Sequence, residues 1–397
     1  MKCLLVVPRW NEVEEGLSSS GRPYLDLLLN CFGYQEVDTL EVESDRAFDP
    51  LSVDEDYTLI LVQGEHNSRL RRSMISNLGL SLGLDSREAG ELRVMGARRL
   101  VDSRGQNVGF AADHRRRRLV IFCEEPIWPI RRTLVRTILS FQQSQHEESG
   151  HSRRARYASC WMVEGESDRD ELASLLEIEG TGSASAIRLL PDGDLAIRLS
   201  PFHGEEFRDA VRQRLGSRLY AMEAMPLEEV LNQQLRHAGL RVAVAESCTG
   251  GVISSRLTTL GGSSSFFVDG CVVYSNEAKQ SRLGVSSVLL ERHGAVSAEV
   301  AKAMAHGALQ SSQADLAVAV TGIAGPEGGT AGKPVGTVFL SCINRDGETL
   351  DCSRHYRGDR QRIRQCSSQT ALHLLRRLMP QRLSSQKVVL TEPNWDP

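Results

Sequence analysis

The segment Val242–Gly251, with the sequence VAVAESCTGG, places a sharp turn between a short apolar run and a helix-compatible pattern. Its first residues are small and apolar, as in a buried strand, and its two final glycines allow the backbone to turn before Val252–Leu257. Such a corner brings backbone N–H groups, the hydroxyls of Ser247 and Thr249, and the positive end of a helix dipole to one point. The segment alone leaves three roles open: phosphate binding, nucleophilic attack by Ser247, or chain reversal only.

The length and composition of the chain set the broad class. A chain of 397 residues predicts two or three domains, and 41% hydrophobic with 25% charged residues is typical of globular proteins. No apolar run approaches the ~20 residues that span a bilayer. The first eight residues, MKCLLVVP, carry one basic residue and end at a proline, so we expect a buried strand there rather than a signal peptide. These features predict a cytoplasmic protein without a membrane partner.

Cysteine usage and charge narrow the chemistry. Nine scattered cysteines with no C-x-x-C pair argue against a disulfide framework or a zinc ribbon, so we expect mostly core thiols. A net charge of -4 gives no general attraction to nucleic acid. The basic run Arg115–Arg118 is predicted to be a solvated edge of a hairpin. We therefore expect no metal and no cofactor, and a nucleic-acid partner is unlikely on these grounds.

Pattern and composition divide the chain into three units and a tail. Residues 1–141 alternate apolar runs with amphipathic stretches, which predicts an α/β domain. The polar stretch 142–152 lacks periodicity and is predicted to be an exposed linker. Residues 153–221 predict a small α+β module, and 226–380 repeat a strand, glycine turn and helix order. The tail 381–397 is polar and is expected to fray.

Element boundaries are predicted within the second and third units. In the third unit we expect four buried, parallel strands, a helix from Ala298 to Leu309 capped by Ser297, and a last helix over about 360–378. The four strands are Val242–Ala245, Cys271–Tyr274, Leu316–Val320 and Val335–Cys342. The second unit is expected to contain strands at 158–163, 187–190 and 195–199, a hairpin turn at Pro191–Asp194, and helices at 168–176 and 205–215.

Further segments of the third unit accompany the opening turn in a fixed order. They are GGSSS (261–265), VYSNEAK (273–279), GAVS (294–297), VAVTGIAGP (318–326), KPVGT (333–337) and RGDR (357–360). Together with AESCTGG they resemble the CinA C-terminal domain family, whose members include nicotinamide mononucleotide amidohydrolases. The resemblance covers nearly all of residues 226–380.

The resemblance implies a Ser–Lys amidohydrolase in which Ser247 is the nucleophile and Lys279 the base. Tyr274 also matches the family and would pass a proton or orient the lysine. The implied reaction converts nicotinamide mononucleotide into nicotinate mononucleotide and ammonia, in pyridine-nucleotide salvage. The pairing is chemically reasonable because a serine needs a base, and a buried lysine with a lowered pKa can serve as one. No Gly-x-Ser-x-Gly elbow appears in this unit.

The substrate-binding candidates come from the glycine-rich turns and two arginines. The turns offer N–H donors to a phosphate or an oxyanion, and the choice between the two loops stays open. Cys248, beside the nucleophile, is expected to be a packing residue. The candidates are Thr249, Gly250, Gly251, Asn276, Thr321, Gly322, Gly325, Arg357 and Arg360.

The order of the three units also resembles full-length CinA proteins, with a molybdopterin-binding-like domain, a KH-like module and the deamidase domain. Residues 105–122 carry the pattern of the first domain. Two other places depart from it: 8–12 read PRWNE instead of a Gly-Thr-Glu turn, and 62–68 lack paired aspartates. Without adjacent carboxylates little would hold Mg²⁺, so we predict an inactive first domain that serves structure or assembly. The KH-like module lacks a basic Gly-x-x-Gly loop, so RNA binding is not expected.

Two alternatives to the amidase remain open at this point. A degenerate first domain also fits a non-enzymatic partner protein associated with competence or DNA damage, for which the family is named. The other alternative is an ADP-ribose pyrophosphatase in the first domain. A homo-oligomer is expected only from the family resemblance.

Overall fold

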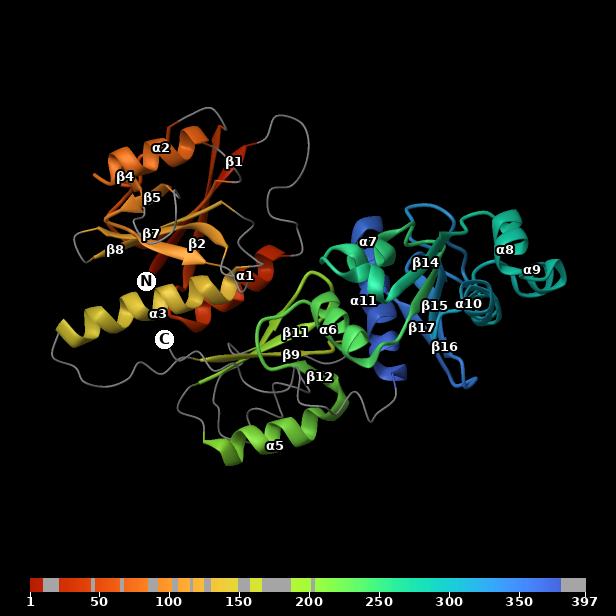
Figure 1. Cartoon of the computed structure of the whole chain (residues 1–397). Coiled ribbons are helices and arrows are strands. Elements are labelled where there is room, and N and C mark those ends of the chain that lie inside the picture. The colour runs from red at the N-terminus through yellow and green to blue at the C-terminus, as the bar shows by residue number, and fades with distance from the viewer. Residues whose placement is uncertain are drawn as a thin grey trace. The chain divides into compact units, whose positions relative to one another are not determined.

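The computed structural model describes residues 1–9, 21–43, 47–64, 68–84, 92–101, 106–114, 117–124, 130–148, 158–165, 187–200 and 204–379. It is a mixed α/β protein with its strands in several sheets, which confirms the predicted class (Figure 1). The chain divides into two compact units, one made mainly of Met1–Cys160 and one made of Trp161–Ile197 and Gly204–Glu392. The finer division into three domains therefore stays a prediction.

The first unit is built on a six-stranded sheet in the order β2-β1-β3-β8-β7-β6. Neighbours from β2 to β8 pair in parallel, and β7 and β6 complete the sheet in the antiparallel sense. A hairpin of β4 and β5 stands beside it. The strands are β1 Lys2–Arg9, β2 Glu36–Glu43, β3 Tyr57–Gln63, β4 Ser81–Leu84, β5 Leu92–Met95, β6 Arg98–Val101, β7 Asn107–His114 and β8 Arg118–Cys123, and the helices are α1 Gly21–Cys31, α2 Ser68–Asn77 and α3 Arg131–Glu148.

Helix α3 corrects the predicted linker. Residues 142–148 belong to its last turns, and Gln142 is buried there, with its side-chain amide donating to the carbonyl of Phe32 at 3.0 Å. Gln, Ser and Glu are compatible with a helix, and a side-chain amide can be buried if it is hydrogen-bonded. Polarity without apolar periodicity was therefore a misleading signal for a linker.

Arg118 corrects the prediction for the basic run. Its side chain is buried, and its guanidinium donates to the main-chain carbonyls of Pro50, Val53, Asp54 and Tyr57. Arg117 is exposed as predicted, while 115 and 116 lie outside the described residues. A guanidinium carries five donors in a planar fork, so one arginine can hold a loop that lacks its own ladder of hydrogen bonds.

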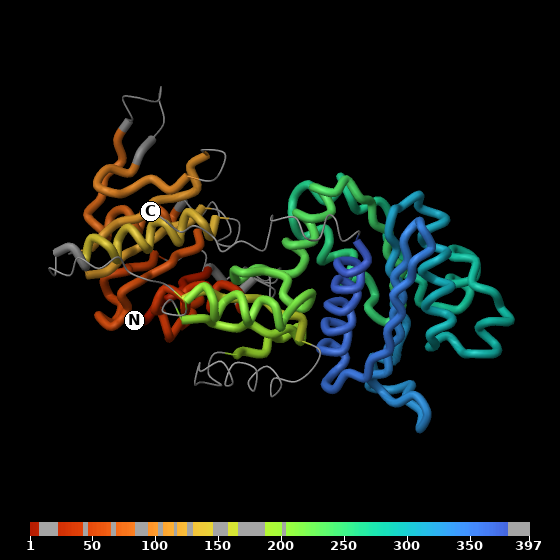
Figure 2. Tube along the Cα trace, turned by 90° about the horizontal axis from the view of Figure 1, so that it is seen from below, coloured from red at the N-terminus to blue at the C-terminus, as the bar shows by residue number. Residues whose placement is uncertain are grey.

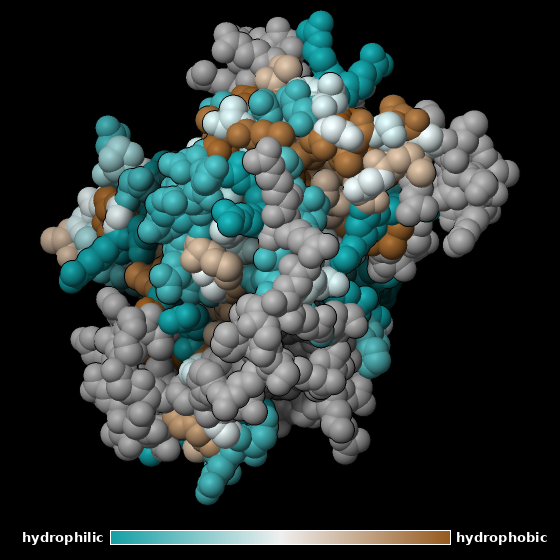
Figure 3. Space-filling view, turned by 90° about the vertical axis from the view of Figure 1, so that its left-hand side faces the viewer, coloured by the Kyte–Doolittle hydropathy of each residue, from teal (hydrophilic) through white to brown (hydrophobic). Residues whose placement is uncertain are grey.

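In the view of Figure 3 the apolar residues of the described surface gather mainly in the upper part, and hydrophilic residues dominate the described surface below it. In the first unit the exposed large apolar side chains include Leu40, Leu82 and Met95. Scattered apolar side chains of this kind are normal for a globular surface. None of the described helices has the length and apolar character that crossing a bilayer requires.

A four-stranded sheet in the order β10-β11-β9-β12 follows. The predicted hairpin is confirmed: β10 and β11 pair antiparallel, and the Leu190 amide donates to the Asp194 carbonyl at 2.8 Å across the turn. The predicted helix at 205–215 is confirmed, whereas the one predicted at 168–176 lies outside the described residues. The elements are β9 Ser159–Val163, β10 Ile187–Leu189, β11 Leu195–Leu199, α5 Glu205–Leu215 and β12 Leu219–Ala221.

A five-stranded sheet in the order β14-β13-β15-β16-β17 carries the candidate site. The central strand β13 is parallel to both neighbours, but β16 and β17 are antiparallel, so the prediction of an all-parallel sheet is wrong. The prediction of burial also fails for β14, an edge strand with largely exposed side chains. The strands are β13 Val242–Glu246, β14 Phe267–Val272, β15 Leu316–Gly322, β16 Thr337–Asn344 and β17 Thr349–His355.

Helices cover both faces of this sheet (Figure 2). On one face the alanines of β13 and β15 pack against Val300 and Met304 of α10, because small side chains on the strands let the helix approach. Helix α11 lies along the other face. Ser297 caps α10 as predicted, its hydroxyl accepting from the Val300 amide. The helices are α6 Leu227–Ala238, α7 Val252–Thr258, α8 Asn276–Leu283, α9 Ser287–His293, α10 Ala298–Ser312 and α11 Arg360–Leu378.

Candidate active site

Ser247 lies at the carboxyl end of the central strand β13, where the chain turns into α7. Its amide donates to the Val320 carbonyl of the adjacent strand β15 at 3.0 Å, and the residue is 7% exposed. Gly250 and Gly251 follow with φ of 59° and 100°, backbone angles that residues other than glycine rarely adopt. The predicted sharp turn is confirmed, and it fixes the serine on a rigid sheet.

Lys279 reaches this serine from α8. The hydroxyl of Ser275 caps that helix by accepting from the Ala278 amide at 3.1 Å, which orients the first turn. The lysine side chain is 1% exposed. Its Nζ lies 3.2 Å from Ser247 Oγ and 3.0 Å from each of the main-chain carbonyl oxygens of Val273 and Tyr274.

These three contacts suit a neutral amine. A neutral lysine has two N–H donors for the two carbonyls and one lone pair, which can accept the Ser247 O–H. Burial lowers the pKa of the Lys279 amine from its ordinary value of 10.5, and the more distant Cys248 and Glu277 oppose that shift. Within the part of the chain that the structure describes, no carboxylate forms an ion pair with Lys279. The site therefore favours the basic form that proton abstraction requires.

Glu246 stabilises the turn through hydrogen bonds to the start of α7. Its carboxylate is fully buried and accepts four hydrogen bonds, from the amides of Gly251, Ile253 and Ser254 and from the Ser254 hydroxyl, at 2.7–3.1 Å. A carboxylate at a helix N-terminus satisfies donors that the helix itself leaves unpaired. The Gly251 amide is thus occupied, contrary to the expectation that it binds substrate.

The sequence did hold a signal for Glu246: an acidic residue that ends a strand shortly before a helix start. That signal is weak, because the last residue of a buried strand usually contributes to packing. Its role appears only when the chain direction through the turn is known.

The amides of Cys248 and Thr249 differ from those that the Glu246 carboxylate binds. The Gly250 amide donates to the Ser247 carbonyl at 3.1 Å, but among the described residues no backbone carbonyl accepts from the amides of Cys248 and Thr249. The Thr249 carbonyl accepts from Nε and Nη2 of Arg364 at 3.0 and 2.7 Å, which anchors the turn to α11. Cys248 and Thr249 are therefore better placed than Gly250 and Gly251 to offer N–H donors to an oxyanion.

Cys248 is a packing residue in the structure as well. It is 4% exposed, and burial raises the pKa of its thiol to about 12. A thiol nucleophile reacts as the thiolate, which such a pKa excludes near neutral pH. Of these two neighbouring residues, Ser247 is the one whose side chain contacts the Lys279 amine.

Tyr274 and Arg360 form the exposed side of the site. Tyr274 is 60% exposed, and its phenol oxygen accepts from Arg360 Nη2 at 3.2 Å, while Arg360 Nη1 donates to the Gly325 carbonyl at 2.7 Å. The tyrosine contacts Lys279 through its main-chain carbonyl, so the expected orientation of the lysine by the phenol is not what the structure shows. Asn276 is exposed at the first position of α8.

The second glycine-containing loop has mainly structural contacts. Thr321 is buried, and its hydroxyl donates to the Ala295 carbonyl at 2.8 Å, so it is not the free donor that was expected. At Gly322 a Cβ atom would lie 2.8 Å from Val338 Cγ2, which explains why a glycine stands there. Gly325 contributes to the site through its carbonyl, which accepts a hydrogen bond from Arg360 and orients that side chain.

Arg357 is not grouped with Ser247. It lines a pocket beside Asp192 and His373 in the same unit, whereas Arg360, three residues later, contacts Tyr274. A shared role of the two arginines in substrate binding therefore stays a prediction. Among the described residues no group of three or more His, Cys, Asp or Glu side chains is arranged to hold a metal ion.

Comparison with known proteins identifies relatives of this segment. A model of the family described as the CinA C-terminal domain matches residues 224–379. A CinA-like protein of Citrifermentans bemidjiense is 48% identical over 169 residues, which are 43% of this chain and 41% of that protein. A CinA-like protein of Geobacter metallireducens is 50% identical over 170 residues, 42% of this chain and 40% of that protein. The match thus spans about two fifths of the length of these curated relatives.

Among solved structures, the competence/damage inducible protein CihA from Agrobacterium tumefaciens shares 47% sequence identity, with 38% of this chain and 91% of that chain covered and a TM-score of 0.37. The residues matched by the family model include the turn at Ser247, Lys279 and all of α11.

Proposed function

Because the chain belongs to the CinA family through residues 224–379, we propose that this segment is a Ser–Lys amidohydrolase that deamidates nicotinamide mononucleotide. The observation that carries the proposal is the 3.2 Å contact between Lys279 Nζ and Ser247 Oγ in a buried setting. A serine beside a lysine of lowered pKa is suited to acyl transfer. The nicotinamide nucleotide itself is the substrate that the family resemblance implies.

In the proposed reaction the neutral Lys279 amine takes the Ser247 hydroxyl proton while the serine oxygen attacks the carboxamide carbon. The oxyanion forms within reach of the amides of Cys248 and Thr249. The lysine ammonium then gives its proton to the departing nitrogen, which leaves as ammonia. Lys279 next deprotonates a water that cleaves the acyl-enzyme to nicotinate mononucleotide. The substrate pyridinium assists by withdrawing electrons from the carboxamide.

Arg360 supports substrate binding in this proposal. It is exposed, and its guanidinium is oriented by the Tyr274 phenol and the Gly325 carbonyl. A guanidinium held in one orientation suits a phosphate monoester because its N–H groups match two phosphate oxygens. We assign the nucleotide phosphate to this side of the site and the carboxamide to the Ser247 side.

The test is to incubate the full chain with nicotinamide mononucleotide and to measure ammonia and nicotinate mononucleotide together. We expect turnover by the wild type and a loss of about 10⁴-fold or more in kcat for Ser247→Ala. Ser255→Ala, on the exposed side of α7, is the matched control and should retain activity. A folded wild type that releases no ammonia refutes the activity and favours the non-enzymatic alternative. Full activity of Ser247→Ala refutes the mechanism.

For the first unit we propose a structural or assembly role rather than phosphoanhydride hydrolysis. The support is the sequence at 62–68, which lacks paired aspartates; 65–67 lie outside the described residues. Incubation with ADP-ribose and Mg²⁺ should release no AMP. Hydrolysis that depends on the metal would overturn this part of the proposal.

A further inference from the structure

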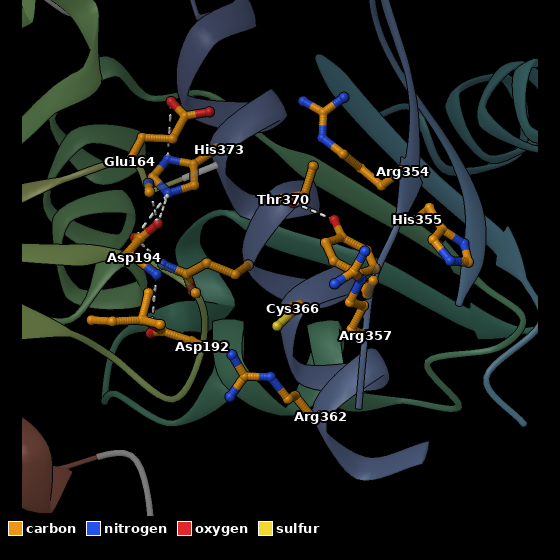
Figure 4. Close-up of a pocket in the computed structure, with 15 residues that line it drawn as sticks. Glu164, Asp192, Asp194, Arg354, His355, Arg357, Arg362, Cys366, Thr370 and His373 are labelled. Atoms are coloured by element: carbon orange, nitrogen blue, oxygen red, sulfur yellow. Dashed lines mark hydrogen bonds and ion pairs between the residues drawn. The ribbon is translucent and has the colours of Figure 1, made fainter. Parts of the chain in front are cut away.

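Helix α11 presents polar side chains in two directions, one of which is the pocket of Figure 4. The pocket residues from this helix include Arg362, Cys366, Thr370 and His373. They follow one another at intervals of three or four positions, the spacing that places side chains on one face of a helix. Arg364 stands two positions after Arg362, so it lies on another face and does not line the pocket. Its side chain reaches the turn that follows Ser247.

Arg364 holds one carbonyl of that turn with two donors. Its Nε and Nη2 donate to the Thr249 oxygen at 3.0 and 2.7 Å, and the Val252 amide makes a longer contact with the same oxygen at 3.4 Å. In the described part of the chain Arg364 has no further hydrogen bond or ion pair. A guanidinium is a rigid planar fork, and hydrogen bonds from a charged donor are stronger than those from a neutral one. The arginine therefore fixes both the position and the direction of this carbonyl.

The Thr249 carbonyl belongs to the peptide group that closes a β-turn. The other half of that group is the Gly250 N–H, which donates to the Ser247 carbonyl at 3.1 Å. Residues 247–250 therefore form a β-turn with Cys248 and Thr249 at its centre. Because a peptide group is planar, Arg364 orients the N–H that closes the turn together with the carbonyl that it contacts.

The two central residues of this turn are those whose amides the proposed reaction uses. Among the described residues no backbone carbonyl accepts from the amides of Cys248 and Thr249. The Glu246 carboxylate binds amides that come after the turn, at the start of α7. Of the described side chains, Arg364 is the one that hydrogen-bonds to the backbone of residues 247–250. The alignment of the two central amides thus depends on a residue of α11.

We propose that Arg364 is a positioning residue for the amidase reaction, which clamps the Thr249 peptide and so keeps the amides of Cys248 and Thr249 directed at the oxyanion. The inference rests on the proposed function. In this role Arg364 contacts neither the substrate nor the reacting oxygen. The two amides stabilise a charge that develops only when Ser247 attacks, so their alignment affects kcat rather than KM.

The test measures ammonia release by variants of the full chain over a range of nicotinamide mononucleotide concentrations. Removal of one oxyanion donor costs about 10²–10³-fold in kcat. Arg364→Ala leaves both donors in place but loosens them, so we expect a loss of about 10- to 100-fold in kcat with KM within about 2-fold of the wild type. Arg364→Lys offers a point charge in place of the fork and should lose less than Arg364→Ala. Arg362→Ala, at an exposed position of the same helix, is the matched control and should retain the wild-type kcat.

Added guanidinium ion distinguishes positioning from a general loss of structure. Guanidinium chloride at about 50 mM, well below the molar concentrations that unfold proteins, should raise the kcat of Arg364→Ala several-fold by occupying the vacated position. The same addition should not raise the kcat of Arg362→Ala or of the wild type. Either of two results overturns the proposal: a wild-type kcat in Arg364→Ala, or a loss of kcat that guanidinium does not reverse.

Failure of the proposed function would be recognised separately. A wild type that releases no ammonia refutes the amidase, and hydrogen exchange of the peptide 247–258 then tests the clamp alone. Exchange should be faster in Arg364→Ala than in Arg362→Ala, because the Gly250 amide loses protection when the turn opens. Equal exchange in the two variants overturns the clamp. Thermal unfolding checks that each variant is folded, and Arg364→Gln replaces Arg364→Ala if the latter is not.

Discussion

Replacing Glu246 with glutamine tests the reasoning about the nucleophile turn most directly. Each oxygen of the carboxylate accepts two hydrogen bonds: Oε1 from the Ser254 amide and hydroxyl, and Oε2 from the amides of Gly251 and Ile253. In Glu246→Gln an NH₂ group must replace one oxygen. When the NH₂ group takes the place of Oε1, it faces the Ser254 amide donor, whereas the Ser254 hydroxyl can rotate and accept from it; the shape of the side chain is unchanged.

The magnitude follows from these contacts. A hydrogen bond to a charged group contributes about 1.5–3 kcal/mol, so the loss of one such bond, with the others weakened by removal of the charge, predicts about 2–4 kcal/mol. Loss of the negative charge at the start of α7 acts in the same direction. Since native domains are stable by about 5–15 kcal/mol, the variant should still fold while its turn opens more often. We therefore expect a lower kcat at a KM close to that of the wild type.

The assay combines urea unfolding with hydrogen exchange of the peptide that spans Ser247–Thr258. Faster exchange there, together with the lower free energy of unfolding, would place the effect at the turn. Glu291→Gln, at an exposed position on α9, is the control and should change stability by no more than about 0.5 kcal/mol. If Glu246→Gln unfolds like the wild type and exchange at 247–258 is unaltered, the assigned role of this carboxylate is refuted.

Three further predictions follow from buried charges. Burial lowers the pKa of Lys279, so the amidase rate should rise with pH and show an apparent pKa below 10.5. Lys279→Met should abolish turnover, yet this variant should be more stable than the wild type at pH 7 because it buries no charge. The native state binds fewer protons than the unfolded chain between the lowered pKa and 10.5, so this stability difference should shrink as pH rises, and a difference independent of pH would contradict the assignment. Burial and the neighbouring Asp194 raise the pKa of Asp192 to about 6, so the charged form of this residue destabilises the fold above pH 6. Asp192→Asn should therefore be more stable than the wild type by roughly 2–3 kcal/mol at pH 7. Thermal unfolding at several pH values should show that this gain decreases below pH 6 and is absent below about pH 4. Arg118→Met should lower the stability of the first unit by about 2–4 kcal/mol in urea, because buried carbonyls lose their donors, whereas the exposed Arg117→Met should have little effect; equal effects would argue against the loop contacts.

Several elements were predictable because their signals are local. The bounds of α5 and α11 and the start of α10 agree with the sequence prediction, since a cap residue or apolar periodicity marks each of them within a few positions. The turn after β13 was predictable for the same reason, from two adjacent glycines. The predictions for α3 and Arg118 failed because the side chains of Gln142 and Arg118 are buried against residues that are distant in the sequence.

The sequence by itself determined the α/β class, the turn at Ser247 and, through the family pattern, the choice of Lys279 as its partner. Only the tertiary structure decided that these side chains meet at 3.2 Å and that Glu246 occupies the amides offered by α7. It also showed that Arg360 contacts Tyr274 and the Gly325 carbonyl. The physical reason is that propensity and capping act between near neighbours, whereas strand direction, burial and the partner of a charge depend on contacts between residues far apart in the sequence.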